Sequence, residues 1–220
     1  MGIVSNYVNE VRHEFLSQEL SKKSVDPNPV KQLEKWIEEA VDSQVLEPNA
    51  MIVSTVDDKL QIPSSRVVYL RGIENNNLRF YTNYHSRKGA EIEEATSSNI
   101  SVLFFYAELE RQVRVEGTIS RLSEEESDAY FNSRPIESKL GAWASEQSQE
   151  IESRQVLIDR LEMYKQKFGD EVPRPPHWGG YEIKPGNFEF WQGRPARLHD
   201  RIVYTKVEPD NSWEIKRIAP

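Results

Sequence analysis

Three side chains near the C-terminus, Arg197, His199 and Arg201, have types and a spacing that suit the binding of an anion. In an extended segment, residues two positions apart lie on the same face of the chain. That spacing places two guanidinium groups and an imidazole side by side, where they repel one another unless an anion lies among them. It predicts half of a pocket for an anionic, planar ligand. The alternative is a solvated edge strand whose charges oppose aggregation.

An aromatic run precedes these three residues. Phe188, Phe190 and Trp191 have the bulk and the β-propensity of a strand in a core. Gly193 and Pro195 then interrupt the pattern, as a turn or a bulge does. The three polar side chains therefore follow a break at the end of a predicted strand.

Two more cations open a predicted helix. Ser86 is typical of an N-cap, and we expect the helix to extend from Arg87 to Ala95. Basic residues in a first helical turn, here Arg87 and Lys88, oppose the helix dipole. They suit a phosphate that binds the free N–H groups at this end of the helix. The alternative is two ordinary solvated charges.

Two arginines lie in a predicted strand from Ile62 to Ile73. Arg66 and Arg71 are five positions apart, so a regular strand points them to opposite faces. They should not bind one phosphate together unless a bulge intervenes. A turn at Asn75-Asn-Asn77 and a return strand at Leu78–Asn83 complete a predicted hairpin.

Arg134 stands at the predicted junction of two helices. Ser123 followed by Glu126 is a capping box, and it starts a helix that we expect to extend to about Arg134. Pro135 must end this helix, because proline excludes the preceding residue from the helical region. A second helix after Pro135 leaves unpaired N–H groups beside Arg134, which suits an anion.

The basic groups that suit phosphate binding are dispersed along the chain: Arg66, Arg71, Arg87, Lys88, Arg134, Arg197 and Arg201. Neutral hydrogen-bonding side chains accompany them: Tyr81, Thr82, Gln112, Ser138, Gln147 and Ser148. So many cations exceed the needs of one phosphate, because each charge-assisted hydrogen bond contributes about 1.5–3 kcal/mol. Two phosphorylated ligands, or a cofactor and a substrate, account for them. No side chain here can carry redox chemistry, so an organic cofactor would have to.

The composition describes a globular chain with a charged surface. The 220 residues include 28 Lys and Arg against 36 Asp and Glu, which gives a net charge of −8. That balance argues against binding to bulk nucleic acid or to an anionic membrane, because both need a basic surface. The chain has no cysteine, no secretory signal and no apolar run of about 18 residues, which favours an intracellular, cytoplasmic protein.

No metal site is expected. The four histidines, His13, His85, His177 and His199, are scattered and lack carboxylates at ligand spacing. The absence of cysteine excludes thiolate chemistry and Cys-ligated metals. The glycine motifs of the Rossmann and P-loop phosphate cradles are also absent. The dispersed side-chain donors are what remains for phosphate.

The remaining pattern predicts a mainly β chain with interspersed helices. Helices are expected at Val30–Gln44 and 154–168, and strands at Met51–Val56, Ile100–Tyr106, Arg111–Ile119, Tyr181–Lys184, Ile202–Val207 and Trp213–Ile218. The nearly all-apolar segment Ile100–Tyr106 predicts a central strand buried on both faces. Seven or eight strands without βαβ alternation favour an antiparallel barrel with peripheral helices, an α+β class. We expect one domain, residues 28–220, after a polar and partly disordered extension, residues 1–27.

Taken together, these segments resemble the pyridoxine/pyridoxamine 5′-phosphate oxidase family over roughly residues 30–220. The motifs that carry the resemblance are Arg66-Val-Val-Tyr-Leu-Arg71, Phe80-Tyr-Thr-Asn83, Ser86-Arg-Lys88, Glu110-Arg-Gln-Val113, Tyr130-Phe-Asn-Ser-Arg-Pro135, Gly141-Ala-Trp143, Gln147-Ser148, Pro176-His-Trp-Gly-Gly180, Phe190-Trp-Gln-Gly193, Arg197-Leu-His-Asp-Arg201 and Arg217-Ile-Ala-Pro220. Each is weak alone, but so many in order are specific. Arg71 stands where the family usually carries lysine, which keeps the charge but not the geometry. Ile218 stands where leucine is usual.

The resemblance implies an FMN-binding split β-barrel that forms a homodimer, with FMN in the cleft between the subunits. It assigns to the cofactor Arg66, Val67, Tyr81, Thr82, Ser86, Arg87, Lys88, Gln112, Gln147, Ser148, Trp191 and Arg201. It assigns to the substrate phosphate Arg71, Tyr130, Arg134 and Ser138. Arg197 and His199, at the substrate ring, are the expected catalytic residues.

The implied reaction is the FMN-dependent oxidation of pyridoxamine or pyridoxine 5′-phosphate to pyridoxal 5′-phosphate, in vitamin B6 biosynthesis and salvage. O2 is the acceptor, and the products include H2O2, with ammonia from the amine. The alternative is a flavin- or haem-binding split-barrel module without oxidase turnover. Such a module needs the cofactor donors but not the five substrate residues Tyr130, Arg134, Ser138, Arg197 and His199. Because all five are present, the enzyme is favoured.

Overall fold

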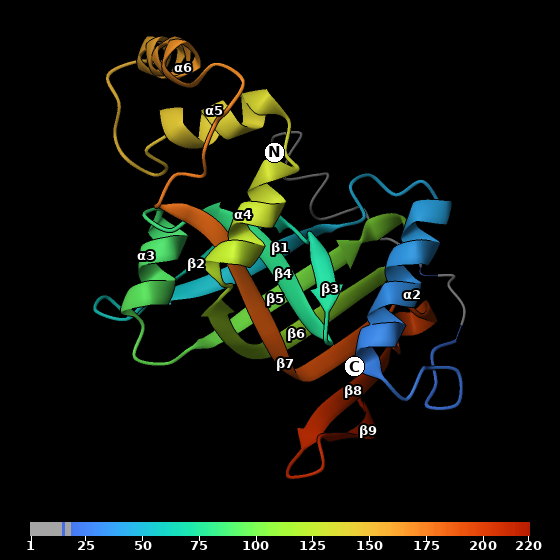
Figure 1. Cartoon of the computed structure of the whole chain (residues 1–220). Coiled ribbons are helices and arrows are strands. Elements are labelled where there is room, and N and C mark those ends of the chain that lie inside the picture. Colours follow the sequence, from blue (N-terminus) through green and yellow to red (C-terminus); the bar gives the residue numbers. More distant parts are fainter. Residues whose placement is uncertain (1–14, 16–18) are drawn as a thin grey trace, which may run out of the picture. The chain divides into compact units, whose positions relative to one another are not determined.

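The computed structural model describes Phe15 and residues 19–220 (Figure 1). The chain forms two compact units. The central unit consists of residues 49–102 and 115–186, and the terminal unit of the described part of residues 1–48 together with 103–114 and 187–220. None of the described helices is long and apolar enough to cross a membrane.

Strands contain more of the described residues than helices do, as the sequence predicts. They are β1 (Ala50–Asp57), β2 (Ile62–Tyr69), β3 (Gly72–Glu74), β4 (Asn77–Asn83), β5 (Asn99–Tyr106), β6 (Arg111–Arg121), β7 (Trp178–Gln192), β8 (Asp200–Val207) and β9 (Ser212–Ile218). They pair in the order β2-β1-β5-β6-β7-β4-β3, with β8 paired to β7 and β9 to β8. The described chain has nine strands rather than seven or eight: the predicted strand from Ile62 to Ile73 forms two, whereas the strand predicted at Tyr181–Lys184 and the aromatic run after it form one, β7.

That predicted strand, which contains Arg66 and Arg71, breaks between them. β2 pairs antiparallel with β1 up to Tyr69. The backbone N–H of Leu70 still donates to the residue before β1, whereas that of Arg71 donates to the carbonyl of Arg79 in β4. The chain changes its pairing partner here, so Arg71 lies outside β2. The expectation that the two arginines point to opposite faces of one strand is therefore wrong.

The helices of the central unit begin where the sequence predicts. They are α3 (Arg87–Glu94), α4 (Glu124–Asn132), α5 (Ile136–Ala144) and α6 (Arg154–Phe168). The hydroxyl of Ser86 accepts from the N–H of Gly89, and Ser123 and Glu126 form the predicted capping box. Pro135 stands at the N-cap of α5. A Cβ atom at Gly89 would lie 2.1 Å from a backbone oxygen of the preceding loop, so only glycine permits this approach.

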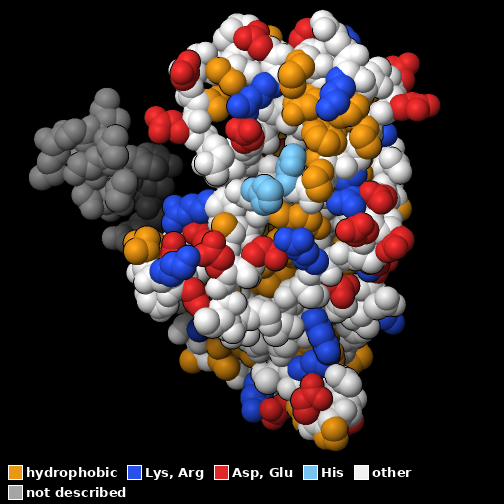
Figure 2. Space-filling view, turned by 60° about the vertical axis from the view of Figure 1, so that its left-hand side comes forward, with side chains coloured by type: hydrophobic (Ala, Val, Ile, Leu, Met, Phe, Trp, Pro, Cys, Tyr) orange, Lys and Arg blue, Asp and Glu red, His pale blue; other side chains and the backbone are white. Residues whose placement is uncertain are grey.

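In the central unit, α5 and α6 lie side by side (Figure 1). Trp143 of α5 contacts the rings of Tyr164 and Phe168 in α6, with centroid distances of 5.4 and 5.0 Å. No residue of α6 is fully buried, and about half of Ile158 and Met163 is exposed. Figure 2 shows hydrophobic side chains at the surface in this region, at the top of the view. The predicted helix is confirmed, but its apolar side is only partly covered.

The terminal unit contains helix α2 (Pro29–Asp42), which the sequence predicts at Val30–Gln44. The side chain of Asn28 caps it by accepting from the N–H of Val30 at 2.9 Å. Its buried stripe consists of Val30, Leu33, Trp36 and Ala40. Trp36 packs edge-on against Phe190 of β7, with ring centroids 5.1 Å apart. The helical periodicity, which places Leu33, Trp36, Ile37, Ala40 and Val41 on one side, therefore identified the helix and part of the side that packs, but 56% of Val41 is exposed.

The described residues before α2 contact β8. The N–H of Leu20 donates to a carboxylate oxygen of Asp200 at 3.0 Å. The hydroxyl of Tyr204 donates to the carbonyl of Asp26 at 2.7 Å. These bonds attach the segment from Leu20 to Asp26 to the terminal unit.

The expectation that β5 is buried on both faces is wrong for the described chain. Val102 and Phe104 are fully buried, but 59% of Phe105 is exposed. Burial alternates along the strand, as it does where only one face of a sheet is covered. Composition alone does not distinguish these two cases, because both faces of β5 carry apolar residues.

Candidate active site

A cavity of about 590 Å³ in the central unit gathers most of the predicted site residues. Those that line it are Arg66, Val67, Arg71, Tyr81, Thr82, Arg87, Lys88, Tyr130, Arg134, Gln147 and Ser148. Residues that the sequence does not single out also line it: Ser64, Ser65, Val68, Tyr69 and Trp178. The first four are neighbours of Arg66 in β2, so the predicted strand that contains Arg66 could have identified them. The motif around Trp178 marks this residue without giving it a role.

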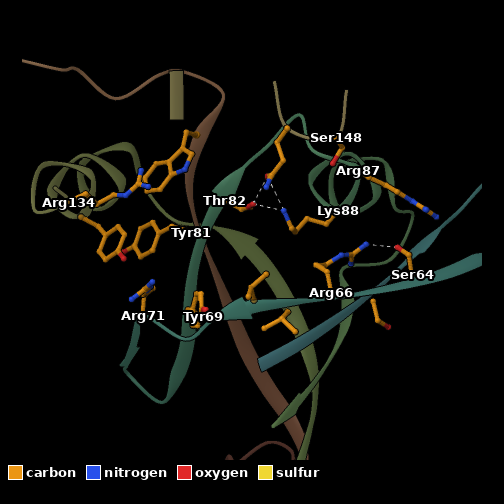
Figure 3. Close-up of a pocket in the computed structure, with 16 residues that line it drawn as sticks. Ser64, Arg66, Tyr69, Arg71, Tyr81, Thr82, Arg87, Lys88, Arg134 and Ser148 are labelled. Atoms are coloured by element: carbon orange, nitrogen blue, oxygen red, sulfur yellow. Dashed lines mark hydrogen bonds between the residues drawn. The ribbon is translucent and has the colours of Figure 1, made fainter. Parts of the chain in front are cut away.

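The cations of this cavity form two groups. The first cation group is Arg66 of β2 with Arg87 and Lys88 of α3, and the second is Arg71 with Arg134. Figure 3 shows the two groups on opposite sides of the close-up. One cavity therefore carries two separate concentrations of positive charge, in a chain whose net charge is −8.

Arg66 is fixed by hydrogen bonds from both outer nitrogens. Nη1 donates to the carbonyl of Val53 at 3.3 Å and to the hydroxyl of Thr55 at 2.5 Å. Nη2 donates to the hydroxyl of Ser64 at 2.5 Å and to a carboxylate oxygen of Glu91 at 3.2 Å. The protein itself thus sets the position of this guanidinium group.

Glu91 of α3 is a buried carboxylate, 7% exposed, that joins the first cation group. Oε1 accepts from Nε of Arg87 at 2.8 Å, and Oε2 accepts from Arg66. The hydroxyls of Thr55 and Ser64 also donate to it. Burial opposes ionisation, but these hydrogen bonds outweigh it and lower the pKa of Glu91 to about 2. Glu91 is therefore ionised and holds both arginines of the group.

Replacing Glu91 with glutamine is expected to lower the free energy of unfolding by about 3 kcal/mol at pH 7. The folded-state pKa lies below the ordinary value of 4.5, so this stability is present above pH 4.5 and is lost as the pH falls through 2. Urea unfolding of both proteins at pH 7 and pH 3 measures it. The difference should shrink to about half at pH 3, and a difference that does not depend on pH contradicts the assignment.

Lys88 is buried, and no carboxylate among the described residues pairs with it. Its Nζ donates to the hydroxyls of Thr82 and Ser86, at 2.6 and 3.1 Å, and to the amide oxygen of Gln147 at 3.2 Å. Burial, and then the charge of Arg66, lowers the pKa of Lys88 to about 8. A buried ammonium group with only neutral partners gains much from a nearby anion.

The second cation group is held by aromatic rings. The guanidinium carbon of Arg71 lies 5.0 Å from the ring centroid of Tyr69, and that of Arg134 lies 4.5 Å from the ring of Trp178. Nη1 of Arg134 is buried and has no hydrogen-bond partner among the described residues. Burial lowers the pKa of Arg134, and the nearby charge of Arg71 adds to this effect. Two like charges and an unpaired N–H group together suit an anion.

A wall of parallel aromatic rings adjoins the second group. The rings of Tyr81 and Tyr130 stack with centroids 3.7 Å apart and planes 8° apart. Trp178 is nearly parallel to Tyr81, at 5.7 Å and 12°. A stack of aromatic rings in a cavity with two cation groups suits ligands that combine a planar ring with a phosphate.

Two predicted residues of the central unit do not line this cavity. Ser138 lines a second cavity of about 350 Å³, to which Arg134 and Trp178 also contribute. Ser86 is 1% exposed, caps α3 and accepts from Lys88. Ser86 thus supports a cation of the first group, and direct contact of either serine with a ligand stays a prediction.

The remaining predicted residues, Gln112, Trp191, Arg197, His199 and Arg201, belong to the terminal unit. The extended segment expected for the last three is wrong, because Pro195–Arg197 form a 3₁₀ turn and Arg197 has a φ of 60°. Pro195, whose ring fixes φ near the helical value, favours this turn over a strand. Arg201 lies in β8 and pairs with Glu189 at 2.7 Å.

His199 has a defined tautomer in its neutral form. Its ring lies 4.6 Å from that of Trp191, and its Nδ1 accepts from the backbone N–H of Arg194 at 3.1 Å. The proton of the neutral ring is therefore on Nε2. Burial, and then the charge of Arg197, lowers the pKa of His199. His199 is thus suited to donate a hydrogen bond from Nε2.

Comparisons with known proteins identify the family of this chain. The family model described as pyridoxamine 5′-phosphate oxidase matches residues 37–168. A second model, described as the pyridoxine 5′-phosphate oxidase C-terminal dimerisation region, matches residues 178–220. The chain is 48% identical over 213 residues to pyridoxine/pyridoxamine 5′-phosphate oxidase 1 of Ralstonia nicotianae, covering 97% of this chain and 99% of that one. It is 50% identical over 212 residues to a pyridoxine/pyridoxamine 5′-phosphate oxidase of Burkholderia mallei, covering 96% and 98%.

Solved structures support the fold. PhzG from Burkholderia lata 383, crystallised with tetrahydrophenazine-1-carboxylic acid, has a TM-score of 0.85 at 29% identity, covering 93% of this chain and 99% of that one. An FMN-binding protein from Nostoc punctiforme, described as pyridoxamine 5′-phosphate oxidase-related, shares the fold with a TM-score of 0.66 at 16% identity. Its alignment covers 90% of this chain and 99% of that chain. The predicted split β-barrel class is confirmed. With family models on most of its length and close relatives over nearly all of it, this chain belongs to the pyridoxamine 5′-phosphate oxidase family.

Proposed function

We propose that this protein oxidises pyridoxamine 5′-phosphate and pyridoxine 5′-phosphate to pyridoxal 5′-phosphate, with FMN as cofactor and O2 as electron acceptor. The names of its relatives support this activity. The observation that carries the proposal is the pair of separate cation groups in one cavity, because cofactor and substrate each bring one phosphate. The alcohol and O2 give the aldehyde and H2O2. The amine, O2 and water give the aldehyde, ammonia and H2O2.

The first cation group fits the phosphate of FMN. Its two guanidinium groups and one ammonium group lie beside the hydroxyls of Ser64 and Ser148, which is the donor set that phosphate monoesters need. Nη1 and Nη2 of Arg87 remain available, because only its Nε donates to Glu91. Bound FMN would supply the two-electron oxidation that no side chain of this chain can carry.

The second cation group fits the phosphate of the substrate. Arg71 and Arg134 would bind it from two sides, with Tyr130 beside them. Capture of a phosphate at this end fixes the distance and orientation of the substrate ring along the aromatic wall. Arginine at position 71 offers two parallel N–H groups, and it therefore constrains the phosphate more than a lysine does.

Arg197 and His199 are proposed to contact the substrate ring. Arg197 is exposed, so its charge is available to offset negative charge on the ring. His199 would donate a hydrogen bond from Nε2, since Nδ1 is occupied by the N–H of Arg194. In the same proposal Gln112, Trp191 and Arg201 contribute to the cofactor site. The family model for the dimerisation region, residues 178–220, supports a homodimer, in which both chains would build each site.

The affinity for FMN is expected to fall about twentyfold between pH 7.5 and 9.5. Burial and Arg66 hold the pKa of Lys88 near 8 in the free protein, and a bound phosphate dianion must raise it. Binding is therefore tightest below pH 8 and weakens as Lys88 loses its proton in the free state. Fluorescence titration with FMN across this range measures the effect. Arginine at position 88 keeps its charge, so K88R should flatten the profile.

Aerobic incubation with pyridoxamine 5′-phosphate tests the proposed function. The protein reconstituted with FMN should form an aldehyde and H2O2 in equal amounts, with release of ammonia. FMN bound without turnover of either phosphorylated substrate would instead favour the non-oxidase flavin module. Protein that binds neither FMN nor pyridoxal 5′-phosphate would contradict both readings.

A further inference from the structure

We propose that Trp178 is a positioning residue that holds Arg134 for the phosphate group of the substrate. This inference rests on the proposed function, because it takes the second cation group as the substrate-phosphate site. The surroundings of Trp178 are those of a core residue, because its side chain is only 7% exposed and packs in a core cluster with Phe131, Leu140 and Val172. These neighbours alone do not require a role in binding. Its position under Arg134 is what points beyond packing.

Arg134 lacks the partner that its counterparts have. Arg66 and Arg87 share the carboxylate of Glu91. Among the described residues no carboxylate pairs with Arg134, and its Nη1 is buried without a hydrogen bond. The face of Trp178, 4.5 Å from the guanidinium carbon, is the nearest ring contact, and Phe131 lies at 5.5 Å.

An aromatic face can hold a guanidinium group in place without occupying its hydrogen-bond donors. A carboxylate would neutralise Arg134 and compete with phosphate for the same N–H groups. A ring attracts the cation through its face and leaves the edge of the guanidinium plane free. Such a hold is needed here, because the charge of Arg71 repels Arg134. Figure 3 shows these two arginines on the same side of the cavity.

Trp178 is itself held firmly. It stands at the first residue of β7, and its ring meets that of Phe131 edge-on, at 5.1 Å and 67°. It is also nearly parallel to the rings of Tyr81 and Tyr130. A ring that packs on three aromatic neighbours restricts the guanidinium group that stacks on it, and the loss of side-chain entropy on phosphate binding is then small.

Affinity for pyridoxal 5′-phosphate, measured by equilibrium dialysis on the FMN-loaded protein, tests the inference. Trp178→Leu is expected to weaken this affinity about tenfold, and Trp178→Phe less, because phenylalanine keeps a weaker aromatic face. The affinity for unphosphorylated pyridoxal should change less than twofold. Trp143→Leu is the matched control, since Trp143 packs on the same core cluster without a contact to Arg134. It should lower stability and leave both affinities unchanged.

A double-variant cycle separates positioning from packing. In an Arg134→Ala background, Trp178→Leu should cause no further loss of affinity for pyridoxal 5′-phosphate. Equal losses for the phosphorylated and unphosphorylated aldehydes, or losses that add to that of Arg134→Ala, overturn the inference. If Trp178→Leu does not fold, Trp178→Phe and fluorinated tryptophan at position 178 give the same comparison. If Arg134→Ala binds pyridoxal 5′-phosphate as tightly as the wild-type protein does, this result instead refutes the proposed function, and the inference with it.

Discussion

Replacing Arg134 with alanine is expected to raise the KM for pyridoxamine 5′-phosphate about a hundredfold and to leave turnover of unphosphorylated pyridoxamine unchanged. Two charge-assisted hydrogen bonds to the phosphate are lost, each of about 1.5–3 kcal/mol, while part of this is recovered by Arg71. The guanidinium group has no ion pair in the described structure, so its removal leaves no buried carboxylate behind. Steady-state kinetics with both substrates measures the difference.

Arg134→Lys is the control that keeps the positive charge and removes the planar shape of the guanidinium group. Lysine keeps the positive charge but offers no planar pair of N–H groups, and we expect roughly a tenfold rise in KM. Equal effects of Arg134→Ala on the phosphorylated and unphosphorylated substrates would contradict the assignment of Arg134 to the phosphate.

Replacing Arg66 with alanine is expected to weaken FMN binding at least about a hundredfold, while riboflavin binding changes little. The variant removes a charge of the first cation group and also one of the two arginine partners of Glu91, which is 7% exposed. Breaking one member of a buried ion pair typically costs about 3–5 kcal/mol, and the other donors to Glu91 reduce this to about 2–3 kcal/mol here. Fluorescence titration with FMN and riboflavin, together with urea unfolding, measures both effects.

Lysine at position 66 is the matched variant. It restores the charge near Glu91, but three N–H groups on one nitrogen cannot reproduce the four hydrogen bonds of the guanidinium fork, so stability should recover more than FMN affinity. If the wild-type protein binds FMN and riboflavin equally well, no phosphate group is recognised at this end of the cavity.

Local chemistry explains why much of the fold could be predicted. Ser86, the capping box at Ser123 and the proline at 135 act within a few residues, so the sequence contains the whole cause of each helix end. The break before Arg71 could not be predicted in this way. It arises because the chain exchanges β1 for β4 as its pairing partner, and pairing between distant strands is not encoded in the arginine spacing.

The candidate site shows the same difference between local causes and contacts between distant segments. Arg87 and Lys88 were recognisable as candidates for phosphate binding, because cations at a helix start make little sense for stability alone. Glu91 was not, since a glutamate followed by Glu93 and Glu94 on a short helix resembles a solvated face. Its role depends on Thr55 and Ser64 of two neighbouring strands, which only the folded chain brings to it.

The segment after β7 gives the clearest lesson about spacing. An alternation of Arg197, His199 and Arg201 has meaning only in extended backbone, and Pro195 instead begins a 3₁₀ turn. The chemical types of these residues do not depend on the backbone, but the geometry inferred from their spacing is wrong. Trp178 shows the converse, because a core tryptophan acquires a second possible role only from the arginine that stacks on it.

Both phosphate assignments depend on one claim, that the cavity holds two phosphorylated ligands at once. Equilibrium dialysis of the FMN-loaded protein against pyridoxal 5′-phosphate, followed by denaturation and quantification of both released compounds, tests this claim directly. The account predicts one FMN and one pyridoxal 5′-phosphate per chain at saturation, with no loss of flavin. Displacement of FMN by pyridoxal 5′-phosphate, one for one, would contradict it.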